Sequence, residues 1–265
     1  MYSRFQLAKK YLHYYFNAYN GKGHGIHSPF VFDFVEFVLN DTTVYSCYQP
    51  IENIRTALLS NENIIDVEDF GAGSSVIKTN HWVVKAMAAS SLKPKKYARL
   101  LYRMVSYYKP KTILELGTSF GITSAYLASG NADAVLYTCE GAASIASIAK
   151  QNFSKLDLQN ILVTEGDFAN TLTPLFLKAP IIDFAFIDGN HRKQPTLEYF
   201  LKLLGSSSPN SILVFDDIHW SKEMEEAWLE IKQHPSVTVT IDLFFIAIVL
   251  INPAFKNKQH FTIRF

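Results

Sequence analysis

The segment TILELGTSFG, residues 112–121, decides the fold of this chain. It opens with a short, mostly apolar run of the kind that forms a buried strand. Two glycines follow, and a helical pattern begins near Ile122. Glycine lets the backbone pass close to a ligand, and the N-terminus of the next helix offers unpaired N–H donors. A strand, a glycine loop and a helix in this order predict a ligand-binding turn of an α/β domain.

Four more apolar runs follow this segment, and each ends in acidic residues or glycine. They are AVLYTCE at 134–140, NILVTEGD at 160–167, IDFAFIDG at 182–189 and SILVFDD at 211–217. Helical patterns separate them, which is typical of a doubly wound parallel sheet. Three further strand patterns, near 237–244, 245–252 and 260–265, have no long helices between them. We therefore predict a Rossmann-like α/β sheet of seven strands, mostly parallel with an antiparallel C-terminal strand.

The residues before 112 have mainly helical patterns. Residues 2–20 place aromatic side chains at spacings near three and four, which predicts a helix with an aromatic face. That face makes a homodimer an expected assembly. A serine and a proline open the run at 28–40, as they do at helix N-termini. Two more helices are expected near 51–61 and 95–108.

This pattern predicts two parts of the chain. Residues 1–94 are expected to form a helical N-terminal extension or lid, and residues 95–265 the Rossmann-like domain. The turn-rich segment Asp69 to Ser74 resembles a second glycine loop, but no acidic strand ends follow it at the expected spacing. We expect this segment to be a loop or lid near the site of the second substrate.

Composition narrows the range of partners and compartments. The net charge of the 265 residues is +1, so we expect neither nucleic acid nor a membrane as a partner. The two cysteines, Cys47 and Cys139, fit neither a disulfide framework nor a Cys-rich zinc site. The first residues lack the pattern of a secretory signal. The expected location is the cytoplasm.

Acidic residues mark three successive strand ends: Glu115, Glu140 and Asp167. Ligands of open parallel sheets bind beyond the carboxyl ends of the strands, so these positions are candidates for binding. A carboxylate at Glu140 can accept hydrogen bonds from both hydroxyls of a ribose. Asp167 could accept one from an adenine amino group. Together they predict a site for an adenosine-containing cofactor.

With these motifs the sequence from 112 to 265 resembles the class I S-adenosylmethionine-dependent methyltransferases. The resemblance implies that S-adenosylmethionine is the cofactor, that the glycine loop lies under its methionine and ribose, and that Glu140 and Asp167 hold its ribose and adenine. The implied cofactor-binding residues are Glu115, Gly117, Thr118, Ser119, Gly121, Glu140, Gly141, Asp167, Phe168 and Asp188.

The later motifs are similar to those of the catechol and caffeoyl-coenzyme-A type of small-molecule O-methyltransferases. This similarity implies methylation of a hydroxyl on a small-molecule acceptor, and Mg²⁺ held by Asp188, Asp216 and Asp217. It also implies catalytic roles for Asp188 and His191, with His191 removing the hydroxyl proton. Asp217 stands where that group usually has asparagine, and His191 where it has lysine.

Two other functions fit parts of the pattern. Residues 117–121 match G-x-S-x-G, so Ser119 could be the nucleophile of an α/β-hydrolase-type esterase. Asp188 or Asp216 and then His219 follow in the order that such a triad requires. In a methyltransferase, Trp220 could instead stack on an aromatic acceptor or on the cofactor base, or only pack. The fold could also bind S-adenosylmethionine without catalysis and serve as an assembly module. A nicotinamide enzyme fits poorly, because Ser119 and Ile122 replace glycines of G-x-G-x-x-G.

Overall fold

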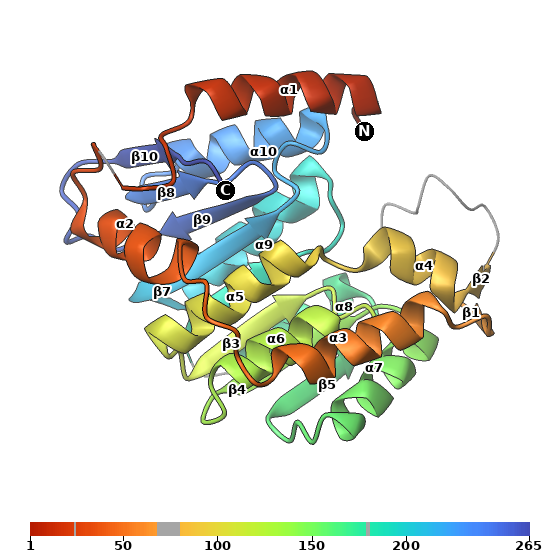
Figure 1. Ribbon diagram of the computed structural model, residues 1–265. Coiled ribbons are helices and arrows are strands. Elements are labelled where there is room, and N and C mark those ends of the chain that lie inside the picture. Colours follow the sequence, from red (N-terminus) through yellow and green to blue (C-terminus); the bar gives the residue numbers. More distant parts are fainter. Residues whose placement is uncertain (24, 68–79, 179–180) are drawn as a thin grey trace. The chain divides into compact units, whose positions relative to one another are not determined.

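A computed structural model describes residues 1–23, 25–67, 80–178 and 181–265 (Figure 1). The chain divides into two compact units. The continuous unit is Thr42–Pro180, and the split unit combines Met1–Asp41 with Ile181–Phe265. The segment expected to be a lid at 69–74 lies outside the described residues. The domain boundary expected between 94 and 95 stays a prediction.

Three parallel strands form the centre of the continuous unit. They are β3 (Thr112–Leu116), β4 (Val135–Glu140) and β5 (Ile161–Glu165), with β4 between the other two. A helix follows each strand: α6 (Ile122–Gly130), α7 (Ala143–Lys155) and α8 (Phe168–Lys178). This alternation places the carboxyl ends of all three strands at one edge, where the glycine loop begins.

The continuous unit begins with helices and one small hairpin. The helices are α3 (Tyr48–Leu59), α4 (Val84–Ser91) and α5 (Lys95–Tyr108), and the hairpin pairs β1 (Ile64–Asp66) with β2 (His81–Val83). A Cβ atom on Gly130 of α6 would lie 2.8 Å from Val105 of α5. The small residue therefore lets these two helices pack closely, beside a buried cluster that includes Tyr48, Tyr102 and Tyr126.

Five strands form the sheet of the split unit. They are β6 (Ile182–Ile187), β7 (Ser207–Asp216), β8 (Val239–Asp242), β9 (Ile246–Leu250) and β10 (Gln259–Thr262). Their order is β10-β8-β9-β7-β6. Strand β6 is parallel to β7, and β9 is antiparallel to both β7 and β8. The connecting helices are α9 (Lys193–Gly205) and α10 (Lys222–Gln233).

The first 41 residues contribute helices to the same unit. Helix α1 (Arg4–Asn17) begins with a capping box, in which Ser3 and Gln6 exchange hydrogen bonds of 3.3 and 2.9 Å. Helix α2 (Pro29–Asp33) starts at the predicted proline and continues as a π-helical turn, η1 (Phe34–Leu39). Figure 1 shows α1 beside α10. No helix among the described residues is long and apolar enough to cross a membrane.

The Rossmann-like α/β class, the mostly parallel strands and the helical N-terminal region are confirmed. The predicted number of seven strands is wrong, because among the described residues the parallel strands β3–β5 and the five strands of the split unit make eight, apart from the β1–β2 hairpin. The antiparallel strand is β9, and the last strand, β10, is parallel to β8. Strand β9 ends opposite Val239, and β10 begins opposite the same residue. The chain thus returns to the start of β8 before it runs along that strand.

Candidate functional site

The loop after β3 turns at its two glycines. Gly117 and Gly121 have φ angles of 101° and 81°, which residues with a side chain rarely adopt. A Cβ atom on Gly121 would lie 2.5 Å from the Phe153 ring, so packing also requires glycine there. The Gly117 and Thr118 N–H groups donate to the Cys139 carbonyl at 3.0 and 3.1 Å. The loop is therefore fixed against the end of β4.

Glu140, the last residue of β4, connects this loop to the start of α7. Its Oε2 accepts a hydrogen bond from the Ser119 N–H at 2.8 Å, and its Oε1 accepts one from the Ala142 N–H at 3.1 Å. Burial raises the pKa of this carboxyl group, and backbone hydrogen bonds from Ala142, Ser119 and Gly141 oppose the rise. Each carboxylate oxygen can accept a further hydrogen bond, so Glu140 can also receive a pair of ligand hydroxyls.

Glu115 has a different environment from Glu140. It is fully buried in β3, and its Oε2 accepts hydrogen bonds from the hydroxyls of Ser124 and Thr138, the latter at 2.6 Å. The Thr118 hydroxyl lies 2.6 Å from that of Thr138. These bonds connect β3, β4 and α6 beneath the glycine loop. They favour a supporting role for Glu115 rather than direct contact with a ligand.

Gly166, Asp167 and Phe168 form the turn between β5 and α8. Gly166 has a φ of 115°, and its N–H donates to the Glu140 carbonyl at 2.9 Å. The Asp167 carbonyl accepts the N–H groups of Asn170 and Thr171 at 3.0 Å each, which opens the helix. Asp167 and Phe168 are half-buried. Both residues therefore lie at the strand edge that also carries Glu140, as the sequence predicts.

A second group of polar side chains lies beyond β6 and β7 of the split unit. Ile187 and Phe215 are register partners, so the residues that follow them, Asp188 and Asp216, emerge side by side. The imidazole of His191 joins them, with its Nε2 at 3.3 Å from the Asp188 Oδ1. One ligand atom from each of Asp188, His191 and Asp216 lies within 4.8 Å of the other two. Asp216 is buried, and the other two are half-buried.

Asp217, the third metal ligand expected from the sequence, is not part of this group among the described residues. It leaves the strand in a left-handed conformation with a φ of 51°. Its N–H donates to the Phe245 carbonyl at 2.6 Å, and its carbonyl accepts the Trp220 N–H at 2.9 Å. Asp217 lies just beyond the end of β7, and its backbone differs from that of a strand, so its carboxylate does not join those of Asp188 and Asp216. His191 takes the third position instead.

Two carboxylates and one imidazole are a donor set that suits a divalent cation. Ligand atoms bound at about 2.1 Å from one ion lie roughly 3 to 4 Å apart, so the observed grouping needs only a small contraction to hold a metal. Carboxylates suit Mg²⁺ and Mn²⁺, while an imidazole shifts the preference toward Mn²⁺, Fe²⁺ or Zn²⁺. The same three side chains can also work without a metal, because Asp188 can orient His191 as a base.

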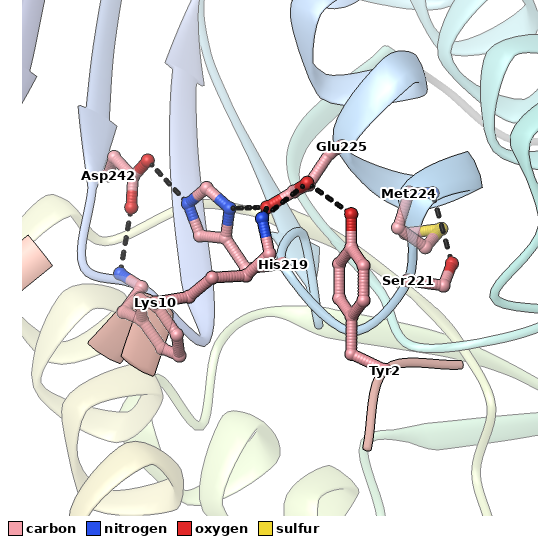
Figure 2. A network of polar contacts seen from close by, with 8 residues as sticks. Tyr2, Lys10, His219, Ser221, Met224, Glu225 and Asp242 are labelled. Carbon is pink, nitrogen blue, oxygen red and sulfur yellow. Dashed lines mark hydrogen bonds and ion pairs between the residues drawn. The ribbon is translucent and has the colours of Figure 1, made fainter. Parts of the chain in front are cut away.

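His219, the residue that the esterase hypothesis needs as a base, is held in a network of polar contacts (Figure 2). Its Nδ1 lies 3.1 Å from Glu225 Oε1, and its Nε2 lies 2.9 Å from Asp242 Oδ2. Glu225 also accepts hydrogen bonds from the Tyr2 hydroxyl at 2.7 Å and from Lys10 Nζ at 2.9 Å. Both ring nitrogens of His219 thus face carboxylates, and neither is left to take a proton from a serine.

Nothing in the sequence pattern indicates this network, because residues that bond directly in it, such as Tyr2 and Glu225, are up to 223 positions apart. Burial would lower the pKa of His219, but the hydrogen bonds and charges of Asp242 and Glu225 outweigh it, so the pKa is raised. The Glu225 pKa is lowered, because hydrogen bonds from Tyr2, Lys10 and His219 outweigh the effect of burial. His219 therefore joins α10 and β8 through Glu225 and Asp242, while Lys10 ties α1 to the Glu225 carboxylate.

We expect His219→Gln to lower the free energy of unfolding by about 1.5–3 kcal/mol near pH 6, the usual effect of losing a hydrogen bond to a charged group. Because the folded pKa of His219 is raised, its stabilising contribution is complete below the unfolded pKa, about 6.5, and declines as pH rises through the folded pKa. Urea unfolding from pH 5.5 to 9 measures this change. His13→Gln, at an exposed position of α1, is the control. A deficit that does not vary with pH would contradict the prediction.

A family model described as a methyltransferase domain matches residues 114–218. Over these residues the chain is similar to a methyltransferase domain. The matched segment starts within β3 and ends just beyond β7, so it contains the glycine loop, Glu140, Asp167 and the Asp188, His191 and Asp216 group. No curated protein matches the chain.

Solved structures share the fold of this chain at low sequence identity. An O-methyltransferase from Bacillus cereus, in complex with SAH, is 19% identical with a TM-score of 0.57, over 79% of this chain and 92% of that one. The O-methyltransferase TomG from Streptomyces achromogenes, in complex with SAM, is 19% identical with a TM-score of 0.53, over 61% and 82%. An SAH-bound methyltransferase from Podospora anserina, PaMTH1, is 13% identical with a TM-score of 0.58, over 95% and 97%.

Proposed function

We propose that this chain is an S-adenosylmethionine-dependent methyltransferase that methylates a hydroxyl of a small molecule. The carboxyl ends of β3, β4 and β5 carry the observation behind this proposal. A glycine loop, a carboxylate and a turn with a second carboxylate follow these three neighbouring parallel strands in that order. The methyltransferase domain match covers all three. Proteins of this fold bind SAM or SAH in solved structures, which supports the same cofactor here.

The proposal divides the work among the predicted residues. Glu140 accepts the ribose hydroxyls, and the glycine loop supports the methionine part of the cofactor. Asp167 and Phe168 meet the adenine. The remaining cofactor contacts come from Gly117, Thr118, Ser119, Gly121, Gly141 and Asp188, with Glu115 holding the loop from beneath. The proposed contacts all come from residues at or just beyond the carboxyl ends of the strands, where parallel sheets bind their ligands.

The acceptor chemistry belongs to Asp188, His191 and Asp216. In the reaction the C–S bond of the sulfonium breaks, a C–O bond forms, and the acceptor hydroxyl gives up its proton. His191 takes that proton, with its ring held by Asp188 at 3.3 Å. A divalent cation bound by these three residues would orient the hydroxyl and lower its pKa. Asp216, which is buried, fixes the position of the group within the domain.

The direct test is calorimetric titration of the full chain with SAH, with NAD as the control ligand. The expected result is micromolar binding of SAH and no binding of NAD. Repeating the titration with Mg²⁺, Mn²⁺ or Zn²⁺ alone tests whether Asp188, His191 and Asp216 bind a divalent cation. If SAH does not bind, the proposal fails, and the chain has kept the fold of a methyltransferase without its cofactor.

We expect His191→Gln to lower turnover by about 100-fold or more, while the SAH dissociation constant changes by less than about twofold. The reason is that His191 acts on the acceptor proton and not on the cofactor. The pH profile separates its two possible roles. Loss of a base removes the limb in which activity rises with pH, whereas loss of a metal ligand is partly rescued by excess metal. Unchanged turnover would remove His191 from the mechanism.

A further inference from the structure

The outward face of α1 carries an exposed apolar stripe. Phe5, Leu12 and Phe16 are 81%, 55% and 73% exposed. At 3.6 residues per turn these three positions lie within about 40° of one another around the helix. Tyr14, which is buried, lies on the opposite side. The helix therefore has two apolar faces, and the packing of the split unit uses only one of them.

The inward face fixes α1 to the split unit. Tyr14 packs with Ala18 and Phe244, and its hydroxyl donates to the Ile263 carbonyl. Lys10 and Tyr2 bond to Glu225 of α10, as Figure 2 shows. The orientation of α1 is thus set by contacts along its length. The stripe of Phe5, Leu12 and Phe16 is presented to solvent by a folded scaffold, and its exposure is a property of the fold.

The stripe lies in a basic environment. Residues 1–32 contain no aspartate or glutamate, and their basic residues are Arg4, Lys9, Lys10 and Lys22. Arg4 and Lys9 are exposed on α1. The guanidinium of Arg264 lies 4.8 Å from the centre of the Tyr15 ring, next to the same face. Residues 1–32 therefore carry a net charge of +4 and the rest of the chain −3, and Lys10 is paired with Glu225 of α10.

We propose that α1 is a membrane-surface helix, which lays the stripe of Phe5, Leu12 and Phe16 into the interface of an anionic lipid bilayer. A helix with an aromatic and aliphatic face bordered by basic side chains is the usual form of such an anchor. Each basic residue near the surface of an anionic leaflet strengthens binding about fivefold. The helix has 14 residues, too few to span a bilayer, so it lies in the plane of the surface.

Charge also favours an anionic membrane over a second copy of the chain as the partner of this face. Pairing of two α1 stripes would give the homodimer that the aromatic spacing predicts. It would also place the charges of Arg4 and Lys9 from both copies in one interface, without an acidic residue from residues 1–32 to offset them. An anionic surface turns the same charges into an attraction. The net charge of +1 predicts no attraction of the whole chain to a membrane, but that prediction does not hold for this face of α1.

Flotation of the full chain with vesicles tests the proposal. One set of vesicles is phosphatidylcholine alone, and the other also contains phosphatidylglycerol. We expect binding to the second set, weakened by high salt. Phe5→Ser with Phe16→Ser should reduce partitioning by about tenfold or more, since the apolar contact is lost. The control is Leu201→Ser with Leu229→Ser, two exposed leucines of α9 and α10 that should not matter.

A second pair of variants tests the charges without altering the apolar stripe. Arg4→Gln with Lys9→Gln should lower partitioning into anionic vesicles by roughly 25-fold, about fivefold per charge. Lys155→Gln with Lys256→Gln, both at exposed positions, is the matched control. Thermal unfolding confirms that each variant is folded. Absence of binding, equal binding to both vesicle types, or a dimer in light scattering that Phe5→Ser with Phe16→Ser dissolves would each overturn the proposal.

Discussion

Glu140→Ala is expected to weaken SAH binding by about two orders of magnitude or more. Each hydrogen bond to a carboxylate contributes about 1.5–3 kcal/mol, and a ribose offers two hydroxyls. The variant also frees the Ser119 and Ala142 N–H groups, which Glu140 now holds at 2.8 and 3.1 Å. The glycine loop then loses one of its fixed points. Calorimetric titration with SAH measures the change directly. Glu140→Gln keeps one acceptor oxygen, so its SAH affinity should lie between those of the wild type and Glu140→Ala.

Glu165 provides the matched control for this variant. It is the register partner of Glu140 on the neighbouring strand and also ends its strand. Its side chain is exposed and paired with Lys150, away from the loop backbone. Glu165→Gln should therefore leave the SAH dissociation constant within about twofold of the wild type. Equal losses in Glu140→Ala and Glu165→Gln would indicate a general disturbance of the strand ends and contradict a ribose contact at Glu140.

The adjacent residues Asp216 and Asp217 are expected to respond very differently to the same substitution. Asp216→Asn removes one carboxylate of the Asp188, His191 and Asp216 group, and turnover should fall by about 100-fold or more. Asp217→Asn should change turnover by less than about threefold. Asparagine tolerates the left-handed conformation that Asp217 adopts, so its fold is preserved. Turnover with saturating acceptor, with and without added divalent metal, provides the comparison.

Cofactor binding is the control for both aspartate variants. Neither change should alter SAH affinity by more than about twofold, because the proposed ribose and adenine contacts lie on other strands. Asp216→Asn should also abolish any stimulation by Mg²⁺ or Mn²⁺. A larger defect in Asp217→Asn than in Asp216→Asn would restore the ligand set expected from the sequence and remove His191 from the group.

Local patterns in the sequence predict much of this fold. The short apolar runs after residue 112 become strands, and the expected helix at 95–108 is α5 at the same residues. Pro29 opens α2, as a proline at the first helical position should. These predictions succeed because each depends on neighbours within a few positions. The count of seven is wrong although the sequence contains eight strand patterns, because the pairing of the last one, β10, with β8 is a long-range contact that no local pattern shows.

The sequence predicts those parts of the candidate site that follow from the order and direction of the strands. Parallel strands bring Asp188 and Asp216 together, so their proximity follows from the alternation of strands and helices. The exclusion of Asp217 follows from a single left-handed residue, which no periodicity reveals. His219 looks like a cleft residue in the sequence. Its pairing with Glu225 and Asp242 depends on where α10 and β8 come to lie.

The composition of the split unit has a consequence for biosynthesis. Residues 1–41 pack with residues 181–265, and Tyr19 forms a β-bridge to Ile263. The first helix therefore emerges from the ribosome long before its partners exist. At a translation rate of about 5–20 residues per second, it waits on the order of ten seconds or more for them. During that interval both apolar faces of α1 are uncovered, so the nascent chain presents a binding site for chaperones that the finished protein has half concealed.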